Sequence, residues 1–207
     1  MHFVAFVVFS FRIVDVSKGK PKRRRSAPST SGLSIRRSTD GRSWILVHPR
    51  CARDRAEDLD EVRLMIEAGE FDVAVDELRW LLSGCAEFIG AHVLLGELAV
   101  AMHDDLTLAR GHFGAGYQLG LQTWRRANRP KPLLYSQPAN RPFFDAGRGL
   151  AWTLEKLGRR GMAEEVLATL LEVDPADPLR VRAMIDEIRA GGAPIVTLQL
   201  PRGDADT

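Results

Sequence analysis

The stretch LEKLGRRGMAEEVLATLLEVDPADP, residues 154–178, decides the predicted fold because it contains a complete helix–turn–helix unit. Apolar residues recur at helical spacing on both sides of Gly158, which predicts two amphipathic helices joined by a turn at this glycine. Asp174 and Pro175 end the second helix, since proline disfavours helical geometry in the residue before it. Ala163 is the small residue at which two antiparallel helices can approach closely.

The same pattern occurs in EAGEFDVAVDELRWLL, residues 67–82. In both stretches a glycine precedes an alanine by five residues, and a leucine follows that alanine by four. A less regular copy lies between them in residues 94–120. The positions shared by the three copies are Gly69, Phe71, Ala74 and Leu78, then Gly96, Ala109 and Phe113, and finally Gly158, Ala163, Leu167 and Pro175.

Together these copies resemble the tetratricopeptide repeat (TPR) family, whose period is about 34 residues. The resemblance covers residues 52–190 and implies an all-α fold: a right-handed superhelix of about three antiparallel helix pairs plus a capping helix. We expect residues 52–192 to form this domain. Two family features are missing, namely a bulky aromatic residue early in each first helix and a closing proline at Ala86.

An insertion separates the second and third copies. Residues 122–144, QTWRRANRPKPLLYSQPANRPFF, contain four prolines and cannot form one helix. We expect the preceding helix to continue briefly, then a loop insertion at about 128–142, with Asn140 capping the next helix. A last amphipathic helix, from Asp177 to about Ala190, should cover the open end of the array.

The N-terminal part differs in composition from the helical region. Residues 1–50 hold eleven Lys and Arg against two Asp, a net charge of +9, whereas the remainder holds 18 basic and 25 acidic residues, a net charge of −7. Low apolar content predicts that residues 1–43 are a disordered basic arm, which a translation start assigned too far upstream would also explain. Residues 44–51 are expected to form an extended lead-in packed on the first helix, and residues 193–207 a flexible tail.

Two binding roles for this arm are considered, one at a membrane surface and one on nucleic acid. The apolar run at residues 3–11 could anchor to a membrane surface, and the KPKRRR run could touch nucleic acid. The apolar run is too short to span a bilayer, and no aromatic residues interleave with the arginines to stack on bases. We therefore expect neither a membrane nor a nucleic-acid partner.

Cys51 and Cys85 are the only cysteines. Their spacing fits neither a zinc site nor a disulfide framework, so we expect free thiols in a reducing, cytoplasmic compartment. The ratio of 24 arginines to 5 lysines indicates a GC-rich bacterial genome.

The TPR resemblance implies a concave groove, lined by the first helix of each pair, that binds a protein or peptide. The expected faces lie in residues 54–68, 89–103 and 143–157. Their polar residues include Asp145 and the candidate partner-binding set Asp54, Glu57, Asp58, Glu61, His92, Glu97, Arg148, Trp152 and Glu155. An acidic rim suits a basic or apolar partner segment, although the same charges could simply form a solvated face.

A second candidate site is the loop at residues 125–144, where cations and aromatics are interspersed. It could hold a small anion or a nucleotide through Arg125, Arg129, Lys131, Tyr135 and Arg141. The alternative is a packed loop whose aromatics fill a gap while its arginines face water.

The sequence contains no Gly-rich phosphate loop, HExxH or GxSxG motif, or acidic metal cluster. We expect no catalysis, no cofactor and no metal. The leading hypothesis is a non-catalytic adaptor that binds another polypeptide, in an oligomeric state that the sequence does not specify.

Overall fold

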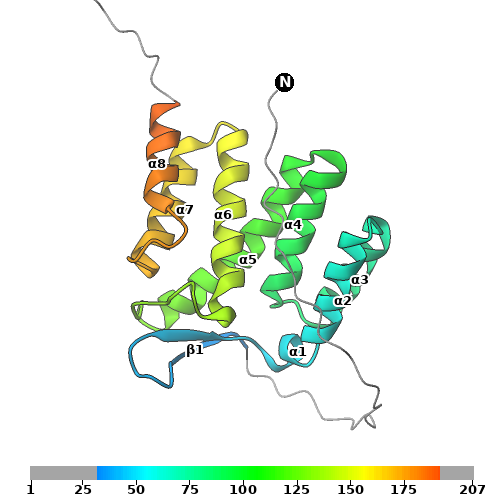
Figure 1. Ribbon diagram of the computed structural model, residues 1–207, viewed down its shortest axis with the longest axis horizontal. Helices are drawn as coiled ribbons and strands as arrows, with labels where there is room; N and C mark the ends of the chain where they lie inside the picture. The colour runs from blue at the N-terminus through cyan, green and yellow to red at the C-terminus, as the bar shows by residue number, and fades with distance from the viewer. Residues whose placement is uncertain (1–31, 192–207) are drawn as a thin grey trace, which may run out of the picture.

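The computed structural model describes residues 32–191 as a mostly helical structure with one small sheet (Figure 1). The helical class predicted from the sequence is therefore confirmed, but the sheet was not expected. The strands are β1 (Ser34–Arg37) and β2 (Trp44–Val47). The helices are α1 (Arg50–Arg53), α2 (Ala56–Glu67), α3 (Phe71–Gly84), α4 (Ile89–His103), α5 (Leu106–Arg126), the 3-10 turn η1 (Pro138–Asn140), α6 (Arg141–Lys156), α7 (Arg160–Val173) and α8 (Val181–Ala190).

From α2 onward each helix packs against the next one along the chain, and α4 also contacts α6 (Figure 1). Tight turns join α2 to α3, α4 to α5, and α6 to α7. Helix α8 lies on α7 at the far end. None of the helices within residues 32–191 has the length and apolar character required to cross a membrane.

The turn inside each helix pair uses a residue with left-handed backbone geometry. Gly69 and Gly158 have φ values of 80° and 73°, which glycine adopts without steric cost. The middle pair has Asp104 at the corresponding position with a φ of 49°. Five residues after each of these turns stands an alanine with no exposed surface: Ala74, Ala109 and Ala163.

The leucines and aromatics at the shared positions have different surroundings. Leu78 and Leu167 are fully buried, and Phe113 is almost so. Phe71 begins α3 and stays partly exposed, and Pro175 lies in the turn after α7.

Helices α4, α5 and α6 meet around the ring of Phe113. A Cβ atom placed on Gly96 of α4 would lie 2.8 Å from this ring, and one on Gly149 of α6 would lie 2.5 Å from it. Phe143 fills the space beside Gly120 in the same way, and its ring stacks on Tyr117 with centroids 5.7 Å apart. Glycines thus let large aromatic rings fill the space between helices.

Residues 34–47 form an antiparallel hairpin, with Ser34 opposite Val47 and Arg37 opposite Trp44. This corrects the prediction of a disordered arm reaching residue 43; residues 1–31 lie outside the described part of the chain. Residues 44–51 were expected to pack on the first helix, but the β-hairpin packs against a different part of the protein. Strand β2 lies against η1, and the Trp44 N–H donates to the Pro132 carbonyl at 2.9 Å.

Asn140 occupies the N-cap position of α6, as predicted, but its side chain holds β2 in place and does not cap the helix. Its Oδ1 accepts the Leu46 N–H at 2.8 Å, while its Nδ2 donates to the carbonyls of Trp44 and Leu134 at 3.1 and 2.8 Å. No side-chain cap hydrogen bond is present at the start of α6. Because Asn140 is completely buried, its amide satisfies polar groups that two distant segments would otherwise leave unpaired.

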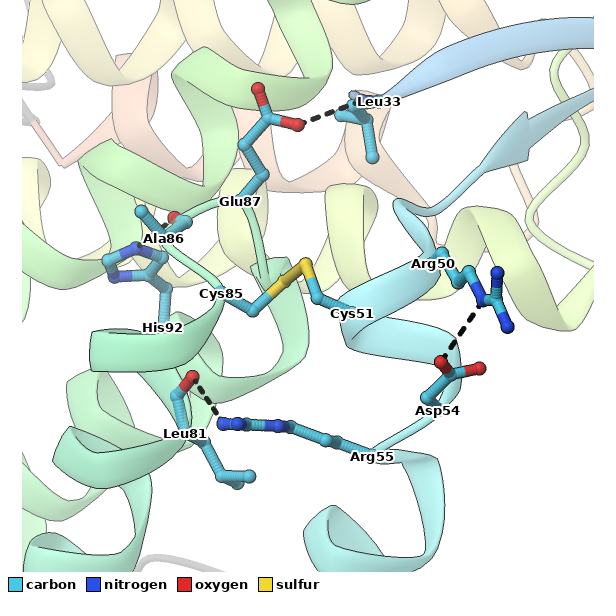
Figure 2. Close-up of a disulfide and its surroundings, with 10 residues drawn as sticks. All are labelled: Leu33, Arg50, Cys51, Asp54, Arg55, Leu81, Cys85, Ala86, Glu87 and His92. Atoms are coloured by element: carbon cyan, nitrogen blue, oxygen red, sulfur yellow. Dashed lines mark hydrogen bonds and ion pairs between the residues drawn. A yellow bond between two sulfur atoms is a disulfide. The ribbon is translucent and has the colours of Figure 1, made fainter. Parts of the chain in front are cut away.

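The two cysteines form a disulfide, which overturns the expectation of free thiols (Figure 2). Cys51 lies in α1 and Cys85 directly follows α3, and their Cα atoms are 5.6 Å apart despite a separation of 34 residues. Helices α2 and α3 run in opposite directions and bring the chain back beside its starting point. The spacing of the two cysteines in the sequence does not reveal this. Disulfides are typical of oxidising compartments, so the argument for a reducing interior loses its basis.

Candidate functional site

The first helices of the three pairs carry charged side chains whose electrostatic fields act on one another. These side chains are Arg63 of α2, Glu97 of α4, and Asp145 and Arg148 of α6. Burial is the main cause that raises the pKa of the Glu97 carboxyl, and the charge of Asp145 raises it further. The charges of Arg63 and Arg148 lower it. Glu97 nevertheless stays exposed to solvent.

Asp145 is the more enclosed of the two carboxylates. Burial raises its pKa, while Arg148 and a hydrogen bond from Tyr135 lower it. The Tyr135 hydroxyl donates to Asp145 Oδ1 at 3.5 Å, and the Arg141 guanidinium lies 5.9 Å from the Tyr135 ring centroid. We call this group the charged face: Arg63, Glu97, Tyr135, Arg141, Asp145 and Arg148.

Helix α6 extends the charged face toward its C-terminus. Asp145, Arg148, Trp152 and Glu155 follow one another at spacings of three or four residues, so they share one side of the helix. Trp152 is 38% exposed, with the Lys156 ammonium 5.9 Å from its ring centroid. The charged face therefore continues into an exposed aromatic surface.

The predicted acidic residues near α2 lie apart from this cluster. Asp54 follows α1 and pairs with Arg50 at 3.3 Å, so it is not on α2 as expected. Glu57 and Glu61 are exposed on α2, and Asp58 is half-buried. Our sequence reasoning considered only the acidic residues of α2 and missed Arg63, which is ion-paired with Asp60 and also acts on Glu97 and Asp145.

His92 faces away from the charged face, contrary to expectation. Its ring contacts His112 of α5, with the two Nδ1 atoms 3.5 Å apart, and its Nε2 lies 3.4 Å from the Ala86 carbonyl oxygen. Burial lowers the pKa of both imidazoles. His92 and Glu97 are five positions apart, which places them on different sides of α4.

The predicted anion loop is a packed segment whose cations have separate partners. Arg129 lies over Trp124 with its guanidinium carbon 5.8 Å from the ring centroid, and Lys131 pairs with Glu172 at 2.7 Å. Arg125 is exposed near the end of α5. Leu133 is fully buried and its N–H donates to the Val173 carbonyl at 3.0 Å. Only Tyr135 and Arg141 lie together, and they belong to the charged face.

The opposite side of α4 carries a cavity of about 420 Å³ between α3 and α5. Its floor is apolar and comes from Leu95, Leu98, Ala99 and Met102 of α4. Asp72, Asp76 and Arg79 of α3 and His112 of α5 line its polar edges. The floor leucines and Ala99 are already at most 5% exposed, so little further apolar surface is available there for a ligand to bury.

Within the described residues, no three His, Cys, Asp or Glu side chains are grouped so that they could hold a metal ion. No family model, curated protein or solved structure matches this chain. Residues 32–191 form a series of helices that pack consecutively and carry the charged face.

Proposed function

We propose that this protein is a TPR-like, non-catalytic adaptor that binds a polypeptide segment on the charged face. The observation that carries the proposal is the electrostatic state of Glu97 and Asp145. Partial burial raises the pKa of both carboxylates, and the charge of Arg148 lowers the pKa of each. Neither they nor Arg148 belong to the ion pairs observed within residues 32–191, so their charges are available to a ligand.

The charges specify the ligand's chemistry. A Lys or Arg side chain placed between Glu97 and Asp145 would be attracted by both carboxylates. Arg148 would favour an acidic or carbonyl group beside it. Trp152 offers an exposed aromatic surface of the kind that dominates binding energy in many interfaces. The best ligand is therefore a segment with a basic residue next to an apolar one.

A selection experiment tests this proposal. Peptides are selected from a random display library against the full chain, and their affinities are then measured by calorimetry. Glu97→Lys and Asp145→Asn should each weaken binding of a selected peptide at least about tenfold, equivalent to about 1.4 kcal/mol. Glu187→Lys, on the exposed surface of α8, is the matched control. Equal affinities for all these variants, with helical content unchanged, would refute the charged face as the binding site.

Membrane or nucleic-acid contact by the basic run falls in residues 1–31, outside the described part of the chain. A bacterial origin and a cytoplasmic location remain expectations from the sequence, and the disulfide argues against the second because cytoplasmic thiol reductants keep cysteines reduced. No observation gathers the loop cations into an anion or nucleotide site.

A further inference from the structure

The first helix pair, α2 and α3, belongs to a different apolar cluster from the rest of the protein. One cluster joins α1, α2 and α3 to one side of α4, through residues that include Val62, Leu78 and Leu98. The other cluster contains residues of the β-hairpin (β1 and β2), of the opposite side of α4, and of α5 to α8. The apolar residues of the first helix pair therefore join those of the remainder of the core through α4, which makes the pair a candidate for independent local opening.

Most of the noncovalent anchoring of this pair comes from α3, which buries Ala74, Leu78 and Leu81. Helix α2 buries only Leu59 and Val62. Where the pair joins the rest of the chain, Arg55 Nη1 donates to the Leu81 carbonyl at 3.3 Å (Figure 2). The Arg55 guanidinium carbon also lies 4.4 Å from the Trp80 ring centroid. Trp80 itself is 50% exposed, so this contact is largely in water.

The disulfide closes the chain around the whole first pair. Cys51 precedes α2 and Cys85 follows α3 at a sequence separation of 34, so the chain segment between them contains both helices and their turn. A cross-link of this length removes much of the conformational freedom that the opened segment would gain. Its loss therefore favours the open state of this segment far more than that of α5, α6 or α7, which lie outside the loop.

We propose that the Cys51–Cys85 disulfide is a redox latch that holds the first helix pair closed on α4. The thiolate of a dithiol reductant attacks the sulfur of Cys51, which is half-buried, whereas Cys85 is only 4% exposed. The S–S bond breaks, and Cys85 leaves as a thiolate that takes up a proton. The reductant's second thiolate then displaces Cys51, so the reductant becomes a disulfide and the protein gains two electrons and two protons.

Opening the latch would change the charged face. Arg63 lies on α2, so release of the first pair withdraws its charge from Glu97 and Asp145. This consequence for ligand binding rests on the proposed function, but the opening itself does not.

Hydrogen exchange of the full chain, followed by mass spectrometry, tests the latch. We expect amide exchange across α2 and α3 to rise at least about tenfold when dithiothreitol reduces the oxidised protein, with exchange in α5 to α7 unchanged. Reoxidation should restore protection. Cys51→Ser should exchange rapidly in α2 and α3 without reductant and show no further change when it is added.

Two results would overturn the latch. One is unchanged protection of α2 and α3 after complete reduction. The other is a rise in exchange that spreads equally over all helices, which would mean that the disulfide stabilises the whole fold. Because the assay needs no ligand, its failure is distinguishable from failure of the proposed adaptor function, which peptide affinity tests.

Discussion

Replacing Gly149 by alanine tests whether close approach of α4, α5 and α6 depends on the absence of a side chain at this position. The new Cβ atom would lie 2.5 Å from the Phe113 ring. The ring cannot simply move toward α4, because the backbone of Gly96 lies there, with a Cβ position only 2.8 Å from the ring. Overpacking of this kind costs about 1–3 kcal/mol, whereas alanine gains about 1 kcal/mol over glycine in a helix.

The expected net effect of Gly149→Ala is a loss of about 0–2 kcal/mol of unfolding free energy, measured by urea denaturation. The thermal midpoint should fall by up to about 8 °C. Gly111→Ala is the matched control, because a Cβ there would meet nothing within 4 Å, and it should stabilise the protein by up to about 1 kcal/mol. Adding Phe113→Leu should remove most of the penalty, giving a coupling of about 1 kcal/mol in a double-mutant cycle. A Gly149→Ala protein as stable as the Gly111→Ala protein would refute the packing argument.

Two further predictions concern buried polar groups. Asn140→Ala removes three hydrogen bonds from a fully buried site and should lower the free energy of unfolding by about 2–4 kcal/mol in urea denaturation. A change within about 0.5 kcal/mol, the range of surface substitutions, would show that the amide does not anchor β2. Burial raises the pKa of the Glu97 carboxyl in the folded state above its ordinary value of 4.5, so the folded protein holds the carboxyl proton more tightly than the unfolded chain. The free energy of unfolding therefore falls as the pH rises from the unfolded-state pKa to the folded-state pKa. Glu97→Gln should therefore raise the thermal midpoint at pH 7 but not at about pH 3, while Glu187→Gln should shift it at neither pH; an equal shift at both pH values for Glu97→Gln would contradict the pKa argument.

The helix pairs were predictable because their signals are local. Gly69 and Gly158 mark turns within a few residues of the apolar repeats that they separate, and the alanine five residues later is buried in each case. Asp104 takes the same role in the middle pair, with a φ of 49° where the other two pairs have glycine.

The hairpin and the disulfide were missed because distant residues determine them. Strand β1 is four residues long and three of its side chains are exposed, which gives it no clear alternation of apolar and polar residues. Its partner β2 is held by Asn140, 94 residues after Leu46. The cysteines likewise meet only because the α2–α3 hairpin brings the two ends of the pair together.

The candidate site was predicted in part. Glu97, Arg148 and Trp152 were chosen for their helical positions, and the structure places all three on or beside the charged face. His92 was wrong because the helix rotates it toward α5. Tyr135 and Arg141 were assigned to an anion loop, since sequence order does not show that this loop folds back beside Asp145.

An NMR footprint of a selected peptide on the full chain would show directly which surface holds the partner. Our proposal predicts the largest amide shifts around Arg63, Glu97, Asp145 and Arg148, with little change on the opposite side of α4. Shifts confined to the cavity between α3 and α5, or to α8, would contradict it.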